Sequence, residues 1–234
     1  MLEYFSAIRS LIPSRNKTSL FNNVGFKDVS FSYGDLQIFD QASWSGSSNS
    51  VIALFGINGC GKTTALRLIC GSLSLNDFNG NIFPSPNIAT FSFSSSNSAD
   101  LNPFLKCKDV INMILESHNH SVDIPAEKLS LMIGFGKYYN TRIRQLSSGK
   151  RKILSIFRAL SSLADIILLD EPFTHLDDQS TFTVIESINA IKDISTIIIA
   201  SHRRDILHTL TNNIFIVSGN PSSGGDGKIF PLNH

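Results

Sequence analysis

The sequence predicts an α/β fold with a mainly parallel central sheet, and two observations support this. Residues 166–169 and 197–200 contain only apolar side chains, as strands do when both faces of a parallel sheet are covered. A third apolar run, residues 51–55, leads directly into a glycine-rich turn and then an amphipathic segment. An apolar strand, a glycine turn and a helix in this order are typical of an open α/β sheet.

The glycine-rich turn, residues 56–64, fits the pattern G-x-x-x-x-G-K-[ST]. Its glycines let backbone N–H groups turn inward around a phosphate chain, and the following helix adds its positive dipole end. Lys62 supplies a mobile cation for the outer phosphates, and the Thr63 hydroxyl is placed to bind Mg²⁺. The helix is indicated by apolar residues on one face, at Leu66, Ile69 and Leu73. This stretch therefore predicts a nucleoside triphosphate site.

Size and composition narrow the possibilities. The chain has 234 residues, 42% of them hydrophobic, which suffices for one substantial core with an inserted lobe. A net charge of +1, from 20 basic and 19 acidic residues, argues against nucleic acid as a partner. Three cysteines without metal-ligand spacing favour a reducing cytosol. The apolar runs are far shorter than the ~18 residues that span a bilayer, so we expect no membrane crossing.

The first part of the chain is expected to be an arm and linker, residues 1–23, ahead of a single domain, residues 24–234. Apolar residues at Leu2, Phe5, Ile8 and Ile12 indicate a short amphipathic helix, and packing on its own domain or fraying is favoured over membrane contact. Residues 24–33 alternate in polarity, residues 34–35 form a turn and residues 36–39 resume the alternation, which predicts two antiparallel strands.

The middle of the chain predicts two further strands and then helices. Residues 80–83 and 88–93 read as strands, while residues 103–145 have helical periodicity, so a helical lobe is expected at about residues 101–161. His118 and His120 lie close in sequence without a third ligand, which favours a solvated loop over a metal site.

Residues 146–150, Leu-Ser-Ser-Gly-Lys, open the next helix. Ser147 or Ser148 is a candidate N-cap, which leaves free N–H groups and the positive helix end beside Lys150. We therefore expect a second anion site here. The buried face of this helix is predicted to be Ile153, Ile156, Phe157 and Leu160, and a later helix is marked by Phe182, Ile185 and Ile188.

Two carboxylates, Asp170 and Glu171, follow the apolar run at residues 166–169. The carboxyl ends of parallel strands are where such sheets bind ligands, so Asp170 is expected to hold Mg²⁺ through water and Glu171 to face a nucleophilic water; a structural acid pair is the alternative. His202 follows the next buried strand and either reaches a γ-phosphate or is an ordinary loop residue. Residues 219–227 predict a hairpin turn between strands at 214–217 and 228–230.

The order of these pieces resembles the ATP-binding subunit of ABC transporters over most of residues 24–218. Residues 56–64 resemble Walker A, 146–150 the signature, 166–171 Walker B and 174–177 the D-loop. The resemblance implies a P-loop NTPase fold with an N-terminal antiparallel β-subdomain and the inserted helical lobe. It implies metal contacts at Thr63 and Asp170 and catalysis by Glu171 and His202. It implies nucleotide contacts at Tyr33, Gly56, Asn58, Gly59, Cys60, Gly61, Lys62, Thr63, Thr64, Ser147, Gly149 and Asp177.

The resemblance also implies ATP and Mg²⁺ as cofactors and a head-to-tail homodimer or heterodimer that holds ATP between residues 56–64 of one chain and the signature of the other. Such a subunit hydrolyses ATP and powers a separate membrane-spanning subunit from the cytoplasmic side of a membrane. One alternative is a nucleotide-operated clamp with weak or no hydrolysis. Another is a non-transport ABC ATPase acting on DNA or ribosomes, which the near-neutral charge disfavours.

Two departures from the family pattern concern this site. The family places a glutamine, the Q-loop glutamine, where this chain reads Ser-Phe-Ser-Ser at residues 92–95. Either a serine hydroxyl or water replaces its contact to Mg²⁺, or the chain couples weakly. The signature carries Ser148 and Lys150 at its third and last positions; both keep donors available, so we expect anion binding to persist.

Overall fold

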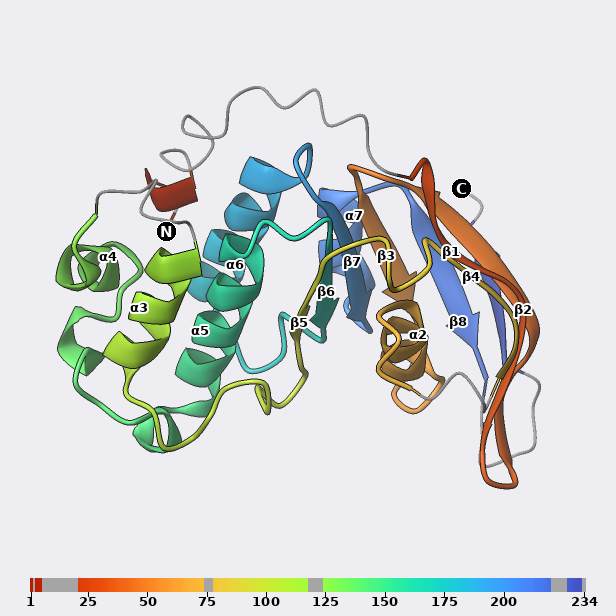
Figure 1. Ribbon diagram of the computed structural model, residues 1–234, viewed down its shortest axis with the longest axis horizontal. Coiled ribbons are helices and arrows are strands. Elements are labelled where there is room, and N and C mark those ends of the chain that lie inside the picture. The colour runs from red at the N-terminus through yellow and green to blue at the C-terminus, as the bar shows by residue number, and fades with distance from the viewer. Residues whose placement is uncertain (2, 6–20, 74–77, 118–123, 220–226, 233–234) are drawn as a thin grey trace.

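A computed structural model of the chain describes residue 1 and residues 3–5, 21–73, 78–117, 124–219 and 227–232. Two β-sheets and six α-helices make up the described part. The larger sheet lies in the middle, with α3 and α4 towards one end and the smaller sheet at the other (Figure 1). Within this described part, every helix is too short or too polar to cross a bilayer.

The larger sheet has six strands in the order β5-β6-β7-β3-β8-β9. Neighbouring strands are parallel except β9, which pairs antiparallel with β8. Its strands are β3 (Val51–Phe55), β5 (Phe91–Ser94), β6 (Ile166–Asp170), β7 (Thr196–Ser201), β8 (Ile214–Ser218) and β9 (Lys228–Pro231). The mainly parallel sheet is confirmed, and the carboxyl ends of β3, β6 and β7 meet at one edge.

The smaller sheet is antiparallel, in the order β2-β1-β4, as predicted for the N-terminal subdomain. Its strands are β1 (Asn23–Tyr33), β2 (Leu36–Ser47) and β4 (Phe78–Phe83). The prediction ended β2 too early, at residue 39. Its second half buries alternate residues, Ala42, Trp44 and Gly46, so the period-2 signal was present, but two of its three buried positions carry small residues.

The helices begin with α2 (Lys62–Ile69), which follows the glycine-rich turn. The others are α3 (Cys107–Ser117), α4 (Ala126–Met132), α5 (Ser148–Ser161), α6 (Asp178–Ile191) and α7 (Arg204–Leu210). Short 3-10 turns, η2 (Gly136–Tyr138) and η3 (Ile143–Gln145), connect α4 to α5. The predicted face of α5 is buried, but Phe182 of α6 is exposed. Ile188 is buried as predicted, together with Val184 and Ile191, and Ile185 is partly buried against the same core.

Strand β6 separates two hydrophobic cores. Ile167 and Leu169 pack in the core that contains α3, α5 and α6. Ile166 and Leu168 pack in the other core, with α2 and the three-stranded sheet. Successive side chains of a strand point to opposite faces, so burial of both faces explains why residues 166–169 are all apolar.

The start of the chain packs on α5. Tyr4 and Phe5 are fully buried, and their ring centroids lie 5.1 and 5.8 Å from that of Phe157. This is the packing that the sequence favoured for the arm. Leu2, Ile8 and Ile12 lie outside the described residues, as do His118 and His120.

One predicted strand is shorter than expected, and the strands of one predicted hairpin are paired. The strand expected at residues 88–93 is shorter and starts later, because only Phe91–Ser94 pairs with β6. Strands β8 and β9 pair from Ser218 with Lys228 onwards, as a hairpin requires. Residues 220–226 of its turn lie outside the described part of the chain.

Candidate active site

The glycine-rich turn, residues 56–64, joins β3 to α2 and is called the phosphate loop below. Gly59 and Gly61 have φ angles of 83° and 106°, a backbone conformation that residues with a Cβ rarely adopt. Gly61 is also the N-cap of α2, which begins at Lys62. The loop therefore brings the chain sharply from strand to helix and leaves the helix N-terminus at the sheet edge, a favourable position for an anion.

Lys62 lies at the centre of the site. It is 5% exposed, and its Nζ donates hydrogen bonds to the carbonyls of Gly56 and Ile57 at 2.8 and 2.9 Å. The same Nζ lies 3.3 Å from Glu171 Oε1, an ion pair that is not aligned as a hydrogen bond. A lysine curled over its own loop in this way is placed to reach phosphate oxygens.

Thr63 and Asp170 form the second contact. Thr63 Oγ1 donates to both carboxylate oxygens of Asp170, at 3.1 and 3.0 Å. Asp170 is 1% exposed, and burial raises its pKa above the usual value although the Thr63 hydrogen bond acts in the opposite direction. A hydroxyl beside a buried carboxylate is a pair of hard oxygen ligands that suits Mg²⁺, and the added charge would relieve the cost of burying Asp170.

Glu171 joins the phosphate loop to His202. Its Oε2 lies 2.9 Å from His202 Nδ1 and accepts a longer hydrogen bond from Ser201 Oγ, at 3.4 Å. Its side chain is 13% exposed, against 42% for His202. The backbone of Glu171 has φ 47°, an uncommon conformation for a residue with a side chain. The contacts to Lys62 and His202 fix the position of this carboxylate, and position is the first requirement for a general base.

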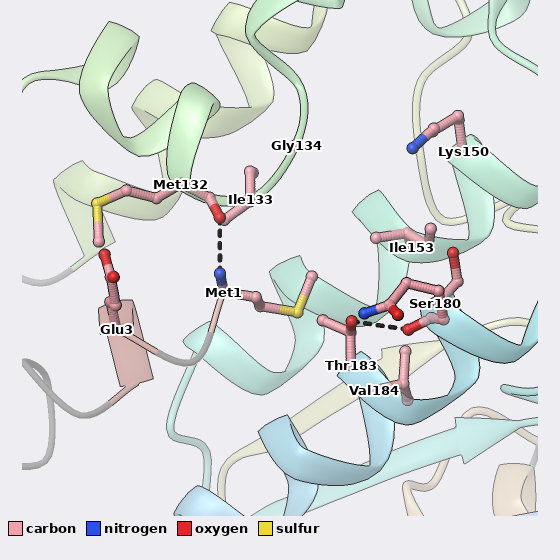
Figure 2. Close-up of a pocket in the computed structure, with 11 residues that line it drawn as sticks. Met1, Glu3, Met132, Ile133, Gly134, Lys150, Ile153, Ser180, Thr183 and Val184 are labelled. Carbon is pink, nitrogen blue, oxygen red and sulfur yellow. Dashed lines mark hydrogen bonds between the residues drawn. The ribbon is translucent and has the colours of Figure 1, made fainter.

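A cavity of about 370 Å³ opens beside these groups. Its lining includes Asn58, Lys152, Glu171, Thr174, His175 and His202. A larger cavity, of about 610 Å³, lies elsewhere, between the chain start and helices α4, α5 and α6 (Figure 2). There the Met1 amino group donates to the Met132 carbonyl at 2.7 Å. Of these two cavities, the smaller is the one that the predicted residues Glu171 and His202 line.

The end of β5 and the loop that follows it, residues 94–100, are bound to α5 by three side chains at successive turns of that helix. Ser155 Oγ lies 2.7 Å from Ser94 Oγ and donates to Asp100. Arg158 donates to Asp100 Oδ2 at 2.9 Å and to the Phe93 carbonyl at 2.8 Å. The third side chain is Lys152, whose Nζ donates to the carbonyls of Ser95, Ser96 and Asp170. Sequence reasoning missed Asp100, Lys152, Ser155 and Arg158, although residues 152, 155 and 158 are polar at helical spacing on one face of α5.

The signature turn, residues 146–150, caps α5. Ser147 is the N-cap, with Oγ accepting from the Lys150 N–H at 3.3 Å, which decides between the two predicted serines. A Cβ on Gly149 would lie 2.8 Å from the carbonyl oxygen of His175, so glycine permits close packing within the chain. Lys150 Nζ lies over the rings of Phe135 and Tyr138, 5.6 and 5.9 Å from their centroids. Its ammonium group is thus bound by aromatic rings.

The remaining predicted residues lie in the phosphate loop, at the end of β1 and at the start of α6. Asn58 of the phosphate loop is exposed, whereas Cys60 and Thr64 of the same loop are buried. Burial raises the pKa of the Cys60 thiol. Tyr33 is 42% exposed, and its ring meets Phe31 edge-on at 4.8 Å. Asp177 is the N-cap of α6 and accepts from the Ser180 N–H at 2.7 Å, a helix-capping contact.

Comparison with known proteins agrees with this geometry. The ABC transporter family model matches residues 39–174. Uup, an ATP-binding protein of Buchnera aphidicola, is 30% identical over 198 residues, covering 82% of this chain and 32% of its own length. The phosphonates import ATP-binding protein PhnC of Fusobacterium nucleatum is 27% identical over 229 residues, covering 87% and 89%. This chain therefore spans about a third of Uup and most of PhnC.

Solved structures show the same fold. The archaeal ribosome recycling factor aABCE1, in complex with the ribosomal stalk protein aP1, superposes with a TM-score of 0.72 at 20% identity, covering 94% of this chain and 41% of its own. The match to the family model includes the phosphate loop, the signature turn and the two carboxylates. The chain belongs to the ABC transporter family and carries its ABC-type ATPase domain.

Proposed function

We propose that this chain binds ATP with Mg²⁺, hydrolyses it within a dimer, and powers transport through a separate membrane-spanning subunit. The observation that carries the proposal is the continuous chain of contacts from Lys62 through Glu171 to His202. It brings a phosphate-binding cation and a candidate general base to one point. A family member built only to hold nucleotide has no need for this arrangement.

Each residue has a distinct part in the proposed reaction. Lys62 binds the outer phosphates of ATP, and Glu171 accepts the proton of the attacking water. His202 orients the Glu171 carboxylate and is itself exposed enough to meet the γ-phosphate. Thr63 and Asp170 would hold Mg²⁺, which supplies charge neutralisation on the phosphates when bound. The exposed Ser147 and the backbone at Gly149 would complete the site of a second chain, homologous or identical.

Turnover and assembly test the catalytic part. Replacing Glu171 by Gln keeps the size of the side chain but removes the base, so ATP turnover should fall about a hundredfold or more. ATP binding should persist, and light scattering should show an ATP-dependent dimer. Glu127→Gln, at an exposed position of α4, is the control and should change neither. Unchanged turnover in Glu171→Gln would remove Glu171 from the role of base.

The transport part rests on relatives and needs its own test. PhnC is named as an import protein, and we propose the same peripheral position at the cytoplasmic side of a membrane for this chain. Affinity purification of the native complex from membranes should recover a polytopic membrane subunit. Recovery of ribosomes or DNA instead would support a non-transport ATPase, as the name of aABCE1 indicates for that protein.

A clamp with weak hydrolysis is the second candidate, because one observation favours it. Ser94 ends β5 where the family places its glutamine, and its hydroxyl is bonded to Ser155 at 2.7 Å and fully buried. It is therefore not available to face Mg²⁺ or water. The clamp predicts that wild-type turnover equals that of Glu171→Gln and that dimerisation requires a different ATP-binding subunit.

A further inference from the structure

Lys152 is a buried cation that the proposed reaction does not use. It is 2% exposed, and its Nζ donates hydrogen bonds to the carbonyls of Ser95, Ser96 and Asp170 at 2.9, 3.1 and 2.8 Å. A lysine ammonium group has three N–H donors, so all three are engaged by backbone. Burying a charge is costly unless the charged group is paired and hydrogen-bonded. Methionine would fill the same space without that cost, which suggests that the hydrogen bonds of Lys152 have a role.

The three carbonyls come from two separate parts of the site. Ser95 and Ser96 belong to the loop of residues 94–100, whose glutamine is missing, and Asp170 ends the strand that delivers Glu171. Lys152 itself lies one turn into α5, the helix that begins at the signature turn. One ammonium group therefore connects the loop, the carboxylate strand and the signature helix at the wall of the 370 Å³ cavity.

Its neighbours on α5 strengthen the connection to the loop but do not reach β6 in the contacts described above. Ser155 and Arg158 bind Asp100, Ser94 and Phe93. Only Lys152 of this polar face also binds Asp170, through the carbonyl. Burial lowers the pKa of Lys152 to about 8, while the negative charges of Asp170, Asp100 and Glu171 act in the opposite direction and offset only part of that effect.

We propose that Lys152 is a positioning residue of the ATPase site, which fixes residues 94–100 to the end of β6 and so holds Asp170 and Glu171 in place for hydrolysis. The inference rests on the proposed function for its effect on turnover. In this proposal, a side chain of α5 links the loop of residues 94–100 to the two carboxylates. The loop itself has Ser94 at the position where the family has its glutamine. Because its donors are saturated, Lys152 acts through Glu171 and not by binding phosphate.

Kinetics of three variants test the role. Lys152→Met removes the donors and keeps an apolar stem, so kcat should fall about tenfold to a hundredfold, as small misplacements in active sites do. Equilibrium ATP affinity should change less than about threefold, because Lys62 is untouched. Lys152→Arg keeps the charge with different donor geometry and should recover part of kcat. Lys128→Met, at an exposed position of α4, is the control.

A comparison in a second background separates positioning from general stability. In a Glu171→Gln background, Lys152→Met should lower turnover by less than about threefold more, because residues that act through one another are not additive. A merely structural lysine would lower ATP affinity and kcat together, would show the same fold-loss in both backgrounds, and would not be rescued by arginine. Those results would overturn the proposal. If Lys152→Met does not fold, Lys152→Arg and Lys152→Gln give the same comparison.

Hydrogen exchange keeps the test independent of turnover. Amides of residues 94–100 should exchange at least about tenfold faster in Lys152→Met than in wild type or Lys128→Met, since the loop loses two of its bonds to α5. If wild type fails to hydrolyse ATP but this difference is present, the proposed function fails and the linkage stands. If wild type hydrolyses ATP and neither exchange nor kcat responds to Lys152→Met, the linkage fails alone.

Discussion

The phosphate loop and the signature turn are both expected to contact phosphate, yet their side chains are arranged differently. In the phosphate loop, Lys62 faces Glu171 across 3.3 Å inside a buried site. In the signature turn, the ammonium group of Lys150 lies over Phe135 and Tyr138. The ammonium group of Lys62 thus faces Glu171 in the candidate site, while that of Lys150 packs on aromatic rings of its own chain.

Gly149 completes this contrast. A Cβ added to Gly149 would lie 2.8 Å from the carbonyl oxygen of His175, so the signature turn packs closely on the segment that leads into α6. What remains exposed there are Ser147 and Ser148, which offer hydroxyls and backbone donors without a free cation. Substitutions should therefore affect nucleotide binding in the first region and stability in the second.

Between the two regions, the largest difference in ATP affinity is expected at Lys62. Lys62→Met removes the cation of the phosphate loop, and a hydrogen bond to a charged group contributes about 1.5–3 kcal/mol, so ATP affinity should fall roughly tenfold to a hundredfold. Isothermal titration calorimetry measures it. Lys150→Met is the matched change in the other region and should reduce affinity of the isolated chain by less than threefold. Equal losses would erase the distinction between the two regions.

Asp100 connects the loop of residues 94–100 to α5, and its contribution to the free energy of unfolding should depend on pH. Burial alone raises its pKa, but hydrogen bonds from Ser155, Ser95 and Arg158 outweigh this, and the pKa lies below the usual 3.8. A lowered pKa means that Asp100 stabilises the fold above pH 3.8 and that this contribution is lost as pH falls through the folded-state pKa.

Asp100→Asn should therefore lower the free energy of unfolding by about 2 kcal/mol at pH 7. The difference from wild type should stay constant down to about pH 4 and shrink below it. Urea unfolding at a series of pH values measures both. Asp205→Asn, whose carboxylate is paired with Arg203 at the surface, is the control and should cost well under 1 kcal/mol. A difference that grew in acid would contradict the assignment.

Gly149→Ala tests the packing in the signature turn. The new Cβ would lie 2.8 Å from the His175 carbonyl, and overpacking of this kind costs about 1–3 kcal/mol. Thermal unfolding of the nucleotide-free chain should show the loss. Ser148→Ala, one residue earlier and exposed, should lie within about 0.5 kcal/mol of wild type. A stable Gly149→Ala that still fails to dimerise would instead give Gly149 a purely intermolecular role.

The smallest effect is expected at Ser147. Ser147→Ala removes the N-cap of α5, and its 3.3 Å hydrogen bond places the cost at the lower end of the 0.5–2 kcal/mol range, at about 0.5 kcal/mol. Ser147→Asp retains a cap but places a negative charge where a partner's phosphate is proposed to bind. Stability should then be kept while ATP-dependent dimerisation is lost. Dimerisation of Ser147→Asp equal to wild type would exclude Ser147 from the interface.

The sequence predicted the parts of this site that depend on local pattern. The phosphate loop is contiguous, and its strand and helix are signalled by periodicity, so Lys62 and Thr63 were assignable from spacing alone. Asp170 and Glu171 were assignable because they end an all-apolar run. The mainly parallel sheet followed from the same runs, although the second half of β2 was missed because Ala42 and Gly46 are weak strand signals.

The contacts that the sequence did not predict join residues far apart in the chain. Lys152 binds carbonyls 57 and 18 residues away, and backbone acceptors leave no mark in a sequence. Likewise, nothing in residues 146–150 indicates that Lys150 turns towards Phe135, because helical periodicity specifies a face but not its neighbours. The role of Gly149 in packing on His175 also depends on tertiary structure alone.

Strand β6 has a further consequence for the chemistry at its end. Its five residues alternate between two cores, and this parity sends Asp170 to the α2 side, where Thr63 meets it. One inserted residue within β6 would point that carboxylate into the opposite core. Two would restore the side but displace the carboxylate by roughly 7 Å along the strand. If Asp170 binds Mg²⁺ as proposed, the length of β6 therefore determines that binding as much as the identity of the acid does.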